Sequence, residues 1–236
     1  MAYAVEMLNI TKEFPGIKAN DNITLRLKEG SIHALLGENG AGKTSLMRLI
    51  VGVAKGYQGE IEVAGEVDPA QIKAHVSYNT PLLGEFSKGE KGKDIVKFYE
   101  QVYPDFSREK FTTISSYLKV KMDSKLSAMS KGEIARLSIA LVFSRIVDLY
   151  LLDEPFEGID SMTRKRIVDT IIKWKEADST VVFSDHYLND IAPLLDEIVI
   201  IKDETIIVHK DADQVREDSG LSVEEYYEQQ YFGEDK

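Results

Sequence analysis

The stretch that decides the fold is Gly37-Glu38-Asn39-Gly40-Ala41-Gly42-Lys43-Thr44. It matches the pattern G-x-x-x-x-G-K-[ST] of the phosphate-binding loop in nucleoside triphosphatases. Apolar residues 32–36 before it predict a strand, and residues 44–53 after it predict a helix. Glycines let consecutive N–H groups turn toward an anion, and the dipole of the helix favours negative charge there. A glycine-rich turn with a chance lysine would not explain this order, so the stretch predicts a nucleoside triphosphate site.

The composition describes an ordinary globular protein, with 43% hydrophobic and 29% charged residues. It has no cysteine, which excludes disulfides and thiolate metal sites and suits the cytosol. The net charge is −11 and no basic run is present, so nucleic acid is not an expected partner. Residues 1–10 lack the basic segment of a signal peptide. Charges interrupt the longest apolar region, 134–152, so we expect no direct membrane insertion.

Strand and helix patterns alternate along the rest of the chain. Expected strands are 5–10, 22–27, 60–63, 74–78, 149–152 and 180–183, with a closing hairpin at 198–201 and 205–208. Helical spacing of apolar residues in 94–103 and 108–118 predicts a helical lobe inserted between strands of a nucleotide-binding core. Phe14, at the turn after the first strand, could stack on a base or simply pack. The acidic tail, 211–236, is expected to be partly helical, and no chemistry is assigned to it.

Polar residues follow two of the apolar strands. Asp153-Glu154 come directly after strand 149–152, where ligands bind in an open α/β sheet. Ser184, Asp185 and His186 follow strand 180–183. The other histidines, His33, His75 and His209, have no comparable setting and are expected to be structural or surface residues.

A further helix is predicted to begin within Met129-Ser130-Lys131-Gly132-Glu133. Ser130 and Glu133 have the spacing of a capping box, which by itself would explain both residues structurally.

Taken in order, these motifs resemble the nucleotide-binding subunit of an ABC transporter over essentially the whole chain. Residues 129–133 are similar to the family signature L-S-G-G-Q, with the serine and second glycine kept as Ser130 and Gly132. The strand that ends in Asp153-Glu154 matches another family motif, and Gly158-Ile159-Asp160 resembles the aspartate loop. His186 takes the place of the switch histidine, and Phe14 falls where the family carries an adenine-stacking aromatic.

The resemblance implies one ABC ATP-binding domain over residues 1–236. Its fold would be α/β, a P-loop NTPase (RecA-like) core with a mixed β-sheet and an inserted α-helical subdomain. Residues 1–80 and 146–210 would form the core, 81–145 the helical subdomain with the signature motif, and 211–236 the acidic C-terminal tail.

The resemblance also implies roles for the motif residues, with ATP and Mg²⁺ as cofactors. Glu154 would polarise the attacking water, His186 would orient it, and Lys43 would hold the β- and γ-phosphates. Thr44 and, through water, Asp153 would hold Mg²⁺. The residues expected to contact nucleotide are Phe14, Gly37, Asn39, Gly40, Ala41, Gly42, Lys43, Thr44, Ser45, Ser130, Gly132 and Asp160.

Ser130 and Gly132 would meet the γ-phosphate of ATP held by a second ATP-binding subunit, which requires two chains head to tail. The second subunit could be the same chain or a different one.

The chain departs from the family pattern in three places. The family normally places a glutamine after the strand corresponding to 74–78; here Asn79 or Glu85 could substitute. The variable places of the signature hold Met129, Lys131 and Glu133. Phe14 replaces the commoner tyrosine and keeps the ring face.

The implied function is ATP hydrolysis that powers separate transmembrane permease subunits. The chain would be cytoplasmic and peripheral, held at the inner face of the membrane by the permease. A soluble ABC ATPase acting on ribosomes or DNA is less consistent with one cassette, no coiled-coil arms and a negative charge. A nucleotide kinase would explain the phosphate loop but not residues 130–133 or His186.

The direction of transport is indicated less directly. Residues 6–47 look similar to ATPases of sugar or nucleoside importers. The helical lobe, residues 153–160 and the short tail look more like single-cassette exporters of the bacitracin or antimicrobial-peptide type, so export is favoured.

Overall fold

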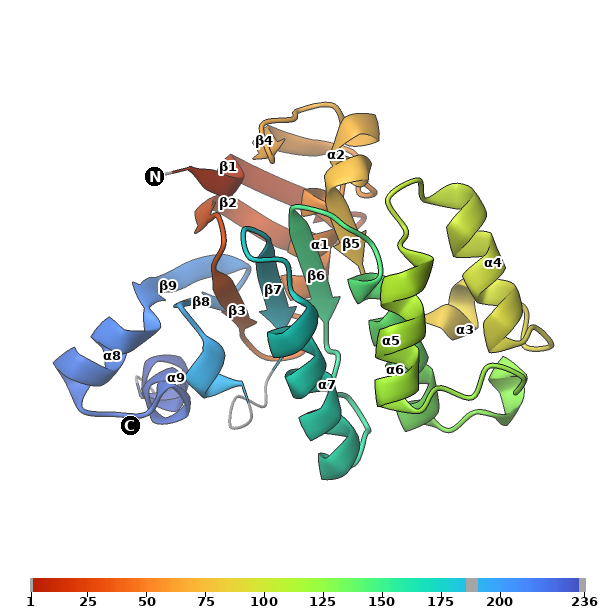
Figure 1. The fold of residues 1–236 in the computed structure, drawn as a ribbon. Coiled ribbons are helices and arrows are strands. Elements are labelled where there is room, and N and C mark those ends of the chain that lie inside the picture. Colours follow the sequence, from red (N-terminus) through yellow and green to blue (C-terminus); the bar gives the residue numbers. More distant parts are fainter. Residues whose placement is uncertain (1, 186–190, 234–236) are drawn as a thin grey trace.

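The computed structural model describes residues 2–185 and 191–233, which form two β-sheets with helices packed around them (Figure 1). The larger sheet has the strand order β5 (Val76–Tyr78), β6 (Leu149–Asp153), β7 (Thr180–Ser184), β3 (Ile32–Leu36), β8 (Glu197–Lys202) and β9 (Thr205–Asp211). Neighbouring strands are parallel except β8 and β9, which are antiparallel. The smaller sheet is antiparallel, in the order β2 (Ile17–Lys28), β1 (Tyr3–Phe14) and β4 (Tyr57–Val63). The predicted α/β class with a mixed sheet is confirmed.

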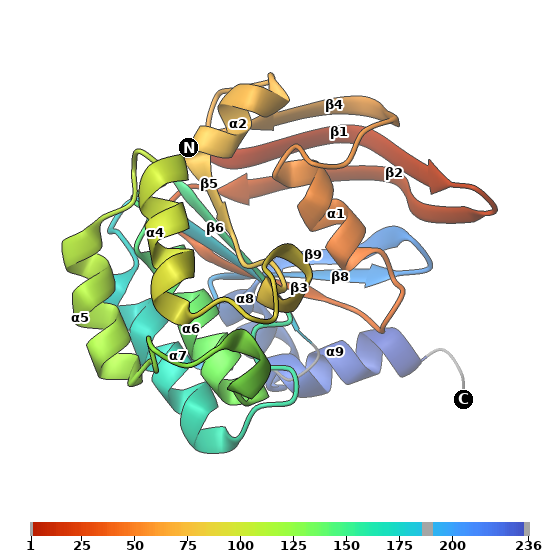
Figure 2. The same cartoon turned by 90° about the vertical axis from the view of Figure 1, so that its right-hand side faces the viewer.

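Two cores follow from the alternation of side chains along the central strands. Leu35 of β3 packs with α1 (Lys43–Ile50) and with the smaller sheet, whereas Ala34 and Leu36 pack on the opposite face. Helix α1 therefore lies between the two sheets (Figure 2). The opposite face is covered by α6 (Lys131–Phe143), α7 (Ser161–Trp174), α8 (Ala212–Ser219) and α9 (Val223–Phe232).

The segment between β5 and β6 is helical. It contains α3 (Leu82–Glu85), α4 (Gly92–Val102), α5 (Arg108–Leu118) and α6, which gather on one side of the larger sheet (Figure 1). Helix α5 has the predicted bounds because Ser107 accepts a hydrogen bond from the N–H of Lys110 (3.2 Å) and Lys119 ends it in the left-handed conformation (φ 55°). Helix α4 is also confirmed, shifted by one or two residues from the predicted range.

The strand predicted at 74–78 is partly wrong. Residues 74 and 75 belong instead to a helix, α2 (Pro69–His75), and the strand begins at Val76. Asp68 caps this helix by accepting a hydrogen bond from the N–H of Ala70 (3.0 Å), and Pro69 starts its first turn. Helix α7 was not predicted, and β1 and β2 extend beyond the predicted ranges.

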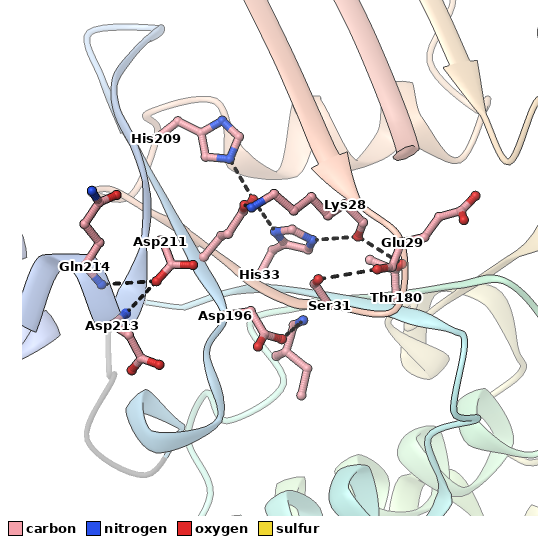
Figure 3. A network of polar contacts seen from close by, with 12 residues as sticks. Lys28, Glu29, Ser31, His33, Thr180, Asp196, His209, Asp211, Asp213 and Gln214 are labelled. Carbon is pink, nitrogen blue, oxygen red and sulfur yellow. Dashed lines mark hydrogen bonds and ion pairs between the residues drawn. The ribbon is translucent and has the colours of Figure 1, made fainter. Parts of the chain in front are cut away.

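At the edge of the larger sheet where β3 begins, polar side chains converge on Glu197 of β8. Figure 3 labels three of them, Lys28, His33 and His209. Its carboxylate lies 2.5 Å from Nζ of Lys28, 3.0 Å from Nε2 of His209 and 3.3 Å from Nδ1 of His33. Burial opposes ionisation of Glu197, but hydrogen bonds from His209, His33 and Lys28 outweigh it and hold its pKa well below the usual range. The network ties β2, β3, β8 and β9 together at the end of β3 opposite the phosphate loop.

In the described part of the chain, no helix is both long enough and apolar enough to cross a bilayer.

Candidate functional site

The phosphate loop connects β3 to α1 at the carboxyl edge of the larger sheet. Two of its glycines lie where a side chain would collide with backbone from other strands. A Cβ on Gly42 (φ 103°) would clash with the carbonyl oxygen of Ala19 in β2, and one on Gly37 would clash with that of Ile201 in β8. The loop thus depends on glycine for close approach as well as for backbone freedom.

Lys43 begins α1, and its side chain folds back over the loop. Its ammonium donates hydrogen bonds to the carbonyl oxygens of Gly37 (2.7 Å) and Glu38 (2.9 Å), and the residue is only 4% exposed. Burial lowers the pKa of Lys43, against the opposing effect of the carboxylates of Glu154 and Asp153. The ammonium is thus held at the loop by two carbonyl groups that phosphate oxygens could replace.

Thr44 and Asp153 meet where the sequence predicts Mg²⁺. The Thr44 hydroxyl lies 3.2 Å from Oδ1 of Asp153, and this oxygen also accepts a hydrogen bond from the Ser184 hydroxyl (2.5 Å). The Tyr78 hydroxyl donates to the other carboxylate oxygen (3.0 Å). A hydroxyl and a carboxylate are hard oxygen ligands of the kind that Mg²⁺ prefers, so Thr44 and Asp153 would be suited to hold it. When bound, the ion would supply positive charge to the phosphates.

Asn79 fixes the backbone of Asp153 from the neighbouring strand end. Its side-chain oxygen accepts a hydrogen bond from the N–H of Asp153 (2.5 Å), and its Nδ2 donates to the carbonyl of Asp153 (3.3 Å). Glu85, the other residue considered as a substitute for the missing glutamine, accepts a hydrogen bond from the Thr80 hydroxyl (2.7 Å). Of the two, Asn79 contacts the predicted metal-binding residue.

Glu154 has a strained backbone. Its φ is 48°, and its N–H donates to the carbonyl oxygen (2.9 Å) and the hydroxyl (3.1 Å) of Ser184. A non-glycine residue held in the left-handed region costs free energy, and such strain concentrates at functional sites. The residue lines two cavities, one of about 410 Å³ shared with Thr44 and Asp153, and a second of about 230 Å³ beside the phosphate loop.

The smaller cavity joins the predicted base-binding and phosphate-binding residues. Its walls include Phe14 together with Gly40, Gly42, Lys43, Thr44, Ser45 and Glu154. Phe14 is 46% exposed, and the ammonium of Lys12 lies 4.5 Å from the centre of its ring. A base could therefore stack on Phe14 while the phosphates enter the loop, and Lys12 would occupy part of the ring surface.

Of the signature residues, Ser130 and Gly132 line neither cavity, whereas Lys131 between them lines the larger one. Ser130 caps α6 in a reciprocal capping box with Glu133, whose carboxylate accepts from the Ser130 N–H (2.8 Å). Hydrogen bonding to Lys121 and to Ser130 lowers the pKa of Glu133 to about 2. Asp160 caps α7 and lies beside Gly132. Neither Ser130 nor Gly132 lines the cavity shared by Phe14 and Lys43, so one chain does not bring all the predicted nucleotide contacts together.

Sequence reasoning missed two residues on the Asp153 carboxylate, Tyr78 and Ser184. Each sits at the carboxyl end of a strand next to β6, so their place could have been found only once the strand order was known. His186 lies outside the described residues, and its predicted role, like those of the other site residues, stays a prediction.

Comparison with known proteins identifies relatives that match most of the chain. A family model described as "ABC transporter" matches residues 20–157. An uncharacterized ABC transporter ATP-binding protein of Methanocaldococcus jannaschii is 32% identical over 203 residues, which cover 84% of this chain and 74% of the relative. The xylose import ATP-binding protein of Thermoanaerobacter pseudethanolicus is 30% identical over 242 residues, covering 94% of this chain and 46% of that protein.

A galactose/methyl galactoside import ATP-binding protein of Clostridium perfringens is 29% identical, covering 84% of this chain and 41% of its own length. The chain thus spans less than half the length of these two sugar import proteins. Among solved structures, an ATP-binding subunit of an ABC transporter superposes with a TM-score of 0.83 at 21% identity, over 96% of this chain and 99% of the other. That likeness supports the fold.

Proposed function

Because the chain belongs to the ABC transporter family, we propose that it binds and hydrolyses ATP in order to power a separate transmembrane permease. It carries the ABC ATPase domain. The observation that carries the proposal is the convergence of Lys43, Thr44, Asp153 and Glu154 at one edge of the larger sheet, next to a cavity that Phe14 also lines.

Hydrolysis of ATP depends mainly on positioning the reactants and neutralising phosphate charge. The residues of the site are suited to both. Lys43 would exchange its bonds to two loop carbonyls for bonds to phosphate oxygens. Asp153 and Thr44 would hold Mg²⁺, which would neutralise phosphate charge. Glu154 would accept a hydrogen bond from the attacking water and hold it in line with the γ-phosphate.

We infer that hydrolysis requires two chains. Ser130 at the N-terminus of α6 is absent from the cavity of its own chain, and its helix end is suited to an anion. A second ATP-binding subunit, placed head to tail, would bring its own Ser130 and Gly132 to the γ-phosphate. The permease would then respond to the joining and separation of the two ATP-binding subunits at the inner face of the membrane.

For the direction of transport we propose export of peptides or antimicrobial compounds. The support is the sequence of the helical lobe and of residues 153–160. Import is the second candidate, favoured by the similarity to the xylose and galactose import proteins, whose matched halves cover most of this chain. Expression with the native permease distinguishes them: an exporter lowers the accumulation of its compound in cells, and an importer raises uptake of a sugar.

Phosphate release tests the proposed ATPase activity. Purified wild-type chain should release phosphate from ATP in the presence of Mg²⁺, and Lys43→Ala should bind ATP at least about tenfold more weakly, since hydrogen bonds to charged groups contribute about 1.5–3 kcal/mol. Titration calorimetry measures the affinity. Failure of the wild-type chain to bind ATP would overturn the proposal.

A further inference from the structure

The C-terminal helix, to which sequence reasoning assigned no chemistry, reaches the phosphate loop. The backbone N–H of Glu38 donates a hydrogen bond to the hydroxyl of Tyr231 in α9, 3.3 Å away and 193 residues along the chain. Figure 2 shows α9 running below β8, beside the loop that enters α1. The family model matches residues 20–157, so Glu38 lies within the matched region and Tyr231 outside it.

The Tyr231 contact falls on the peptide that also holds Lys43. The N–H of Glu38 and the carbonyl of Gly37 belong to one planar peptide group. The Gly37 carbonyl accepts a hydrogen bond from the ammonium of Lys43 at 2.7 Å. Tyr231 and Lys43 therefore hold opposite ends of the same peptide plane.

Tyr231 is itself held firmly. The residue is 7% exposed, its ring centre lies 5.4 Å from that of Tyr227, and its carbonyl accepts a hydrogen bond from the ammonium of Lys202 (2.8 Å). The same ammonium lies 5.4 Å from the centre of the Tyr231 ring. Lys202 ends β8, so β8 and α9 together determine where the hydroxyl lies.

The other side of the same peptide is closed by β8. A Cβ on Gly37 would collide with the carbonyl oxygen of Ile201, the residue before Lys202. The first turn of the phosphate loop therefore lies between Ile201 at the end of β8 and Tyr231 of α9. Rotation of the Gly37–Glu38 peptide would break both the Tyr231 and the Lys43 hydrogen bonds.

We propose that Tyr231 is a positioning residue for nucleotide binding, and the proposal rests on the ATP-binding function argued above. Its hydroxyl keeps the Gly37–Glu38 peptide in the orientation that places Lys43 at the loop, so the loop is ordered before ATP arrives. Without the hydroxyl, this ordering has to occur on binding, and affinity falls. Turnover of bound ATP is unaffected, because the hydroxyl accepts its hydrogen bond from Glu38 and not from a residue expected to act in hydrolysis.

Two tyrosines of α9 provide a matched pair of variants. Tyr231→Phe removes the hydroxyl and keeps the buried ring. Tyr227→Phe removes a hydroxyl from a neighbouring, equally buried ring that makes no hydrogen bond to the loop in the described structure. A purely structural role of the helix predicts similar small effects for both.

Titration calorimetry and steady-state kinetics give the first test. Tyr231→Phe should raise Kd and KM for ATP by about two- to tenfold, the effect expected from losing one neutral hydrogen bond. The kcat should change less than about twofold. Tyr227→Phe should leave all three values near those of the wild-type chain. Equal Kd values for the two variants would overturn the proposal.

Amide hydrogen exchange in the nucleotide-free chain gives a second test that needs no ATP. The Glu38 amide should exchange faster in Tyr231→Phe than in wild type or Tyr227→Phe, and equal exchange would overturn the proposal. The wild-type chain could fail to bind ATP while the Glu38 amide still exchanges faster in Tyr231→Phe. That result would overturn the proposed ATP-binding function but would support the hydrogen bond between Tyr231 and Glu38.

Lys202→Met tests whether β8 acts through Tyr231. Alone, it should raise the Kd for ATP in the same direction as Tyr231→Phe. In the Tyr231→Phe background it should add little, because the hydroxyl it would help to place is already gone. Full additivity of the two effects would show that Lys202 acts by another route and would contradict this part of the proposal.

Discussion

Glu154 combines an acidic side chain with a backbone conformation that few non-glycine residues adopt. Its φ of 48° is maintained by two hydrogen bonds from its N–H to Ser184, and Asn79 holds the preceding residue, Asp153, at both backbone groups. Neighbouring strands thus fix the backbone of two consecutive acidic residues. Asp153 meets Thr44, and Glu154 lines the cavity beside the phosphate loop.

Glu154→Gln should abolish turnover while leaving ATP binding intact. The amide keeps the shape of the side chain but cannot accept a proton from the attacking water, and loss of a general base slows reactions by about 10²–10⁴-fold. Phosphate release measures the rate, and size-exclusion chromatography with ATP and Mg²⁺ should show accumulated dimer. Hydrolysis at the wild-type rate would rule out Glu154 as the base.

At the scale of elements, the conformation of the phosphate loop depends on neighbouring strands and a helix as well as on its own residues. β2 approaches it at Gly42, β8 at Gly37, and α9 at Glu38. A side chain at Gly42, the third glycine of the loop, would collide with β2. This collision would exclude a side chain even if the left-handed backbone strain were tolerated.

A matched pair of glycines separates strain from close approach. Gly40 (φ 91°) has no atom within 4 Å of an added Cβ, whereas at Gly42 (φ 103°) the Cβ meets β2. Gly40→Ala should lower the free energy of unfolding by about 1–2 kcal/mol, the cost of a left-handed alanine. Gly42→Ala should lose about 1–3 kcal/mol more through overpacking. Urea unfolding of nucleotide-free protein measures both, and equal losses would contradict the contact with β2.

The Glu197 network gives the fold a dependence on pH. The pKa of the Glu197 carboxyl is depressed in the folded state. As pH falls, this carboxyl therefore takes up a proton first in the unfolded chain, near its ordinary pKa of about 4.3. The stabilisation is therefore full above about pH 5 and is lost as pH falls toward the depressed value. Lys28, His33 and His209 face the carboxylate from β2, β3 and β9.

Glu197→Gln should lower the free energy of unfolding at pH 7 by about 1.5–3 kcal/mol, since hydrogen bonds to a charged group are lost. Its stability should also vary less than that of wild type between about pH 5 and pH 3. Glu6→Gln is a suitable control, because Glu6 pairs with Arg26 at the surface and should change stability by less than about 1 kcal/mol. Parallel pH profiles for wild type and Glu197→Gln would exclude the network as the source.

At the scale of the whole molecule, the predicted nucleotide contacts fall into two groups. Phe14, Lys43 and Thr44 share one cavity, while Ser130 and Gly132 lie at the start of α6, where Gly132 is beside Asp160 at the start of α7. A single chain leaves them apart. A second ATP-binding subunit, the same chain or a different one, placed head to tail would bring the second group to the first.

Mixing two inactive variants tests the shared site. Lys43→Ala removes the phosphate contact, and Ser130→Arg puts a bulky side chain where the γ-phosphate would lie, so either homodimer should be nearly inactive. In a mixed dimer both changes fall in the same composite site, and the other site is intact. Phosphate release plotted against mixing ratio should therefore peak near equal amounts, provided that one intact site turns over alone.

The wild-type chain must first show ATP-dependent self-association, and each variant must be folded and exchange partners. With those controls met, a flat line would count against a head-to-tail site.

The sequence by itself determined the phosphate loop, the order of the motifs, most of the strands and the helices α4, α5 and α6, but not α7. These depend on local properties: glycine's backbone freedom, the spacing of apolar side chains, and caps such as Ser107 before α5 and Ser130 before α6. Local patterns also misled, because residues 74 and 75 have strand-like character but are held in α2, where Asp68 caps the helix.

Only the tertiary structure decided which distant residues meet. Tyr78 and Ser184 reach Asp153 because β5 and β7 are the neighbours of β6. Tyr231 reaches Glu38 because α9 packs beside β8, next to β3. No spacing along the chain encodes these contacts, since they follow from strand order and helix packing, which arise from burying both faces of the larger sheet at once.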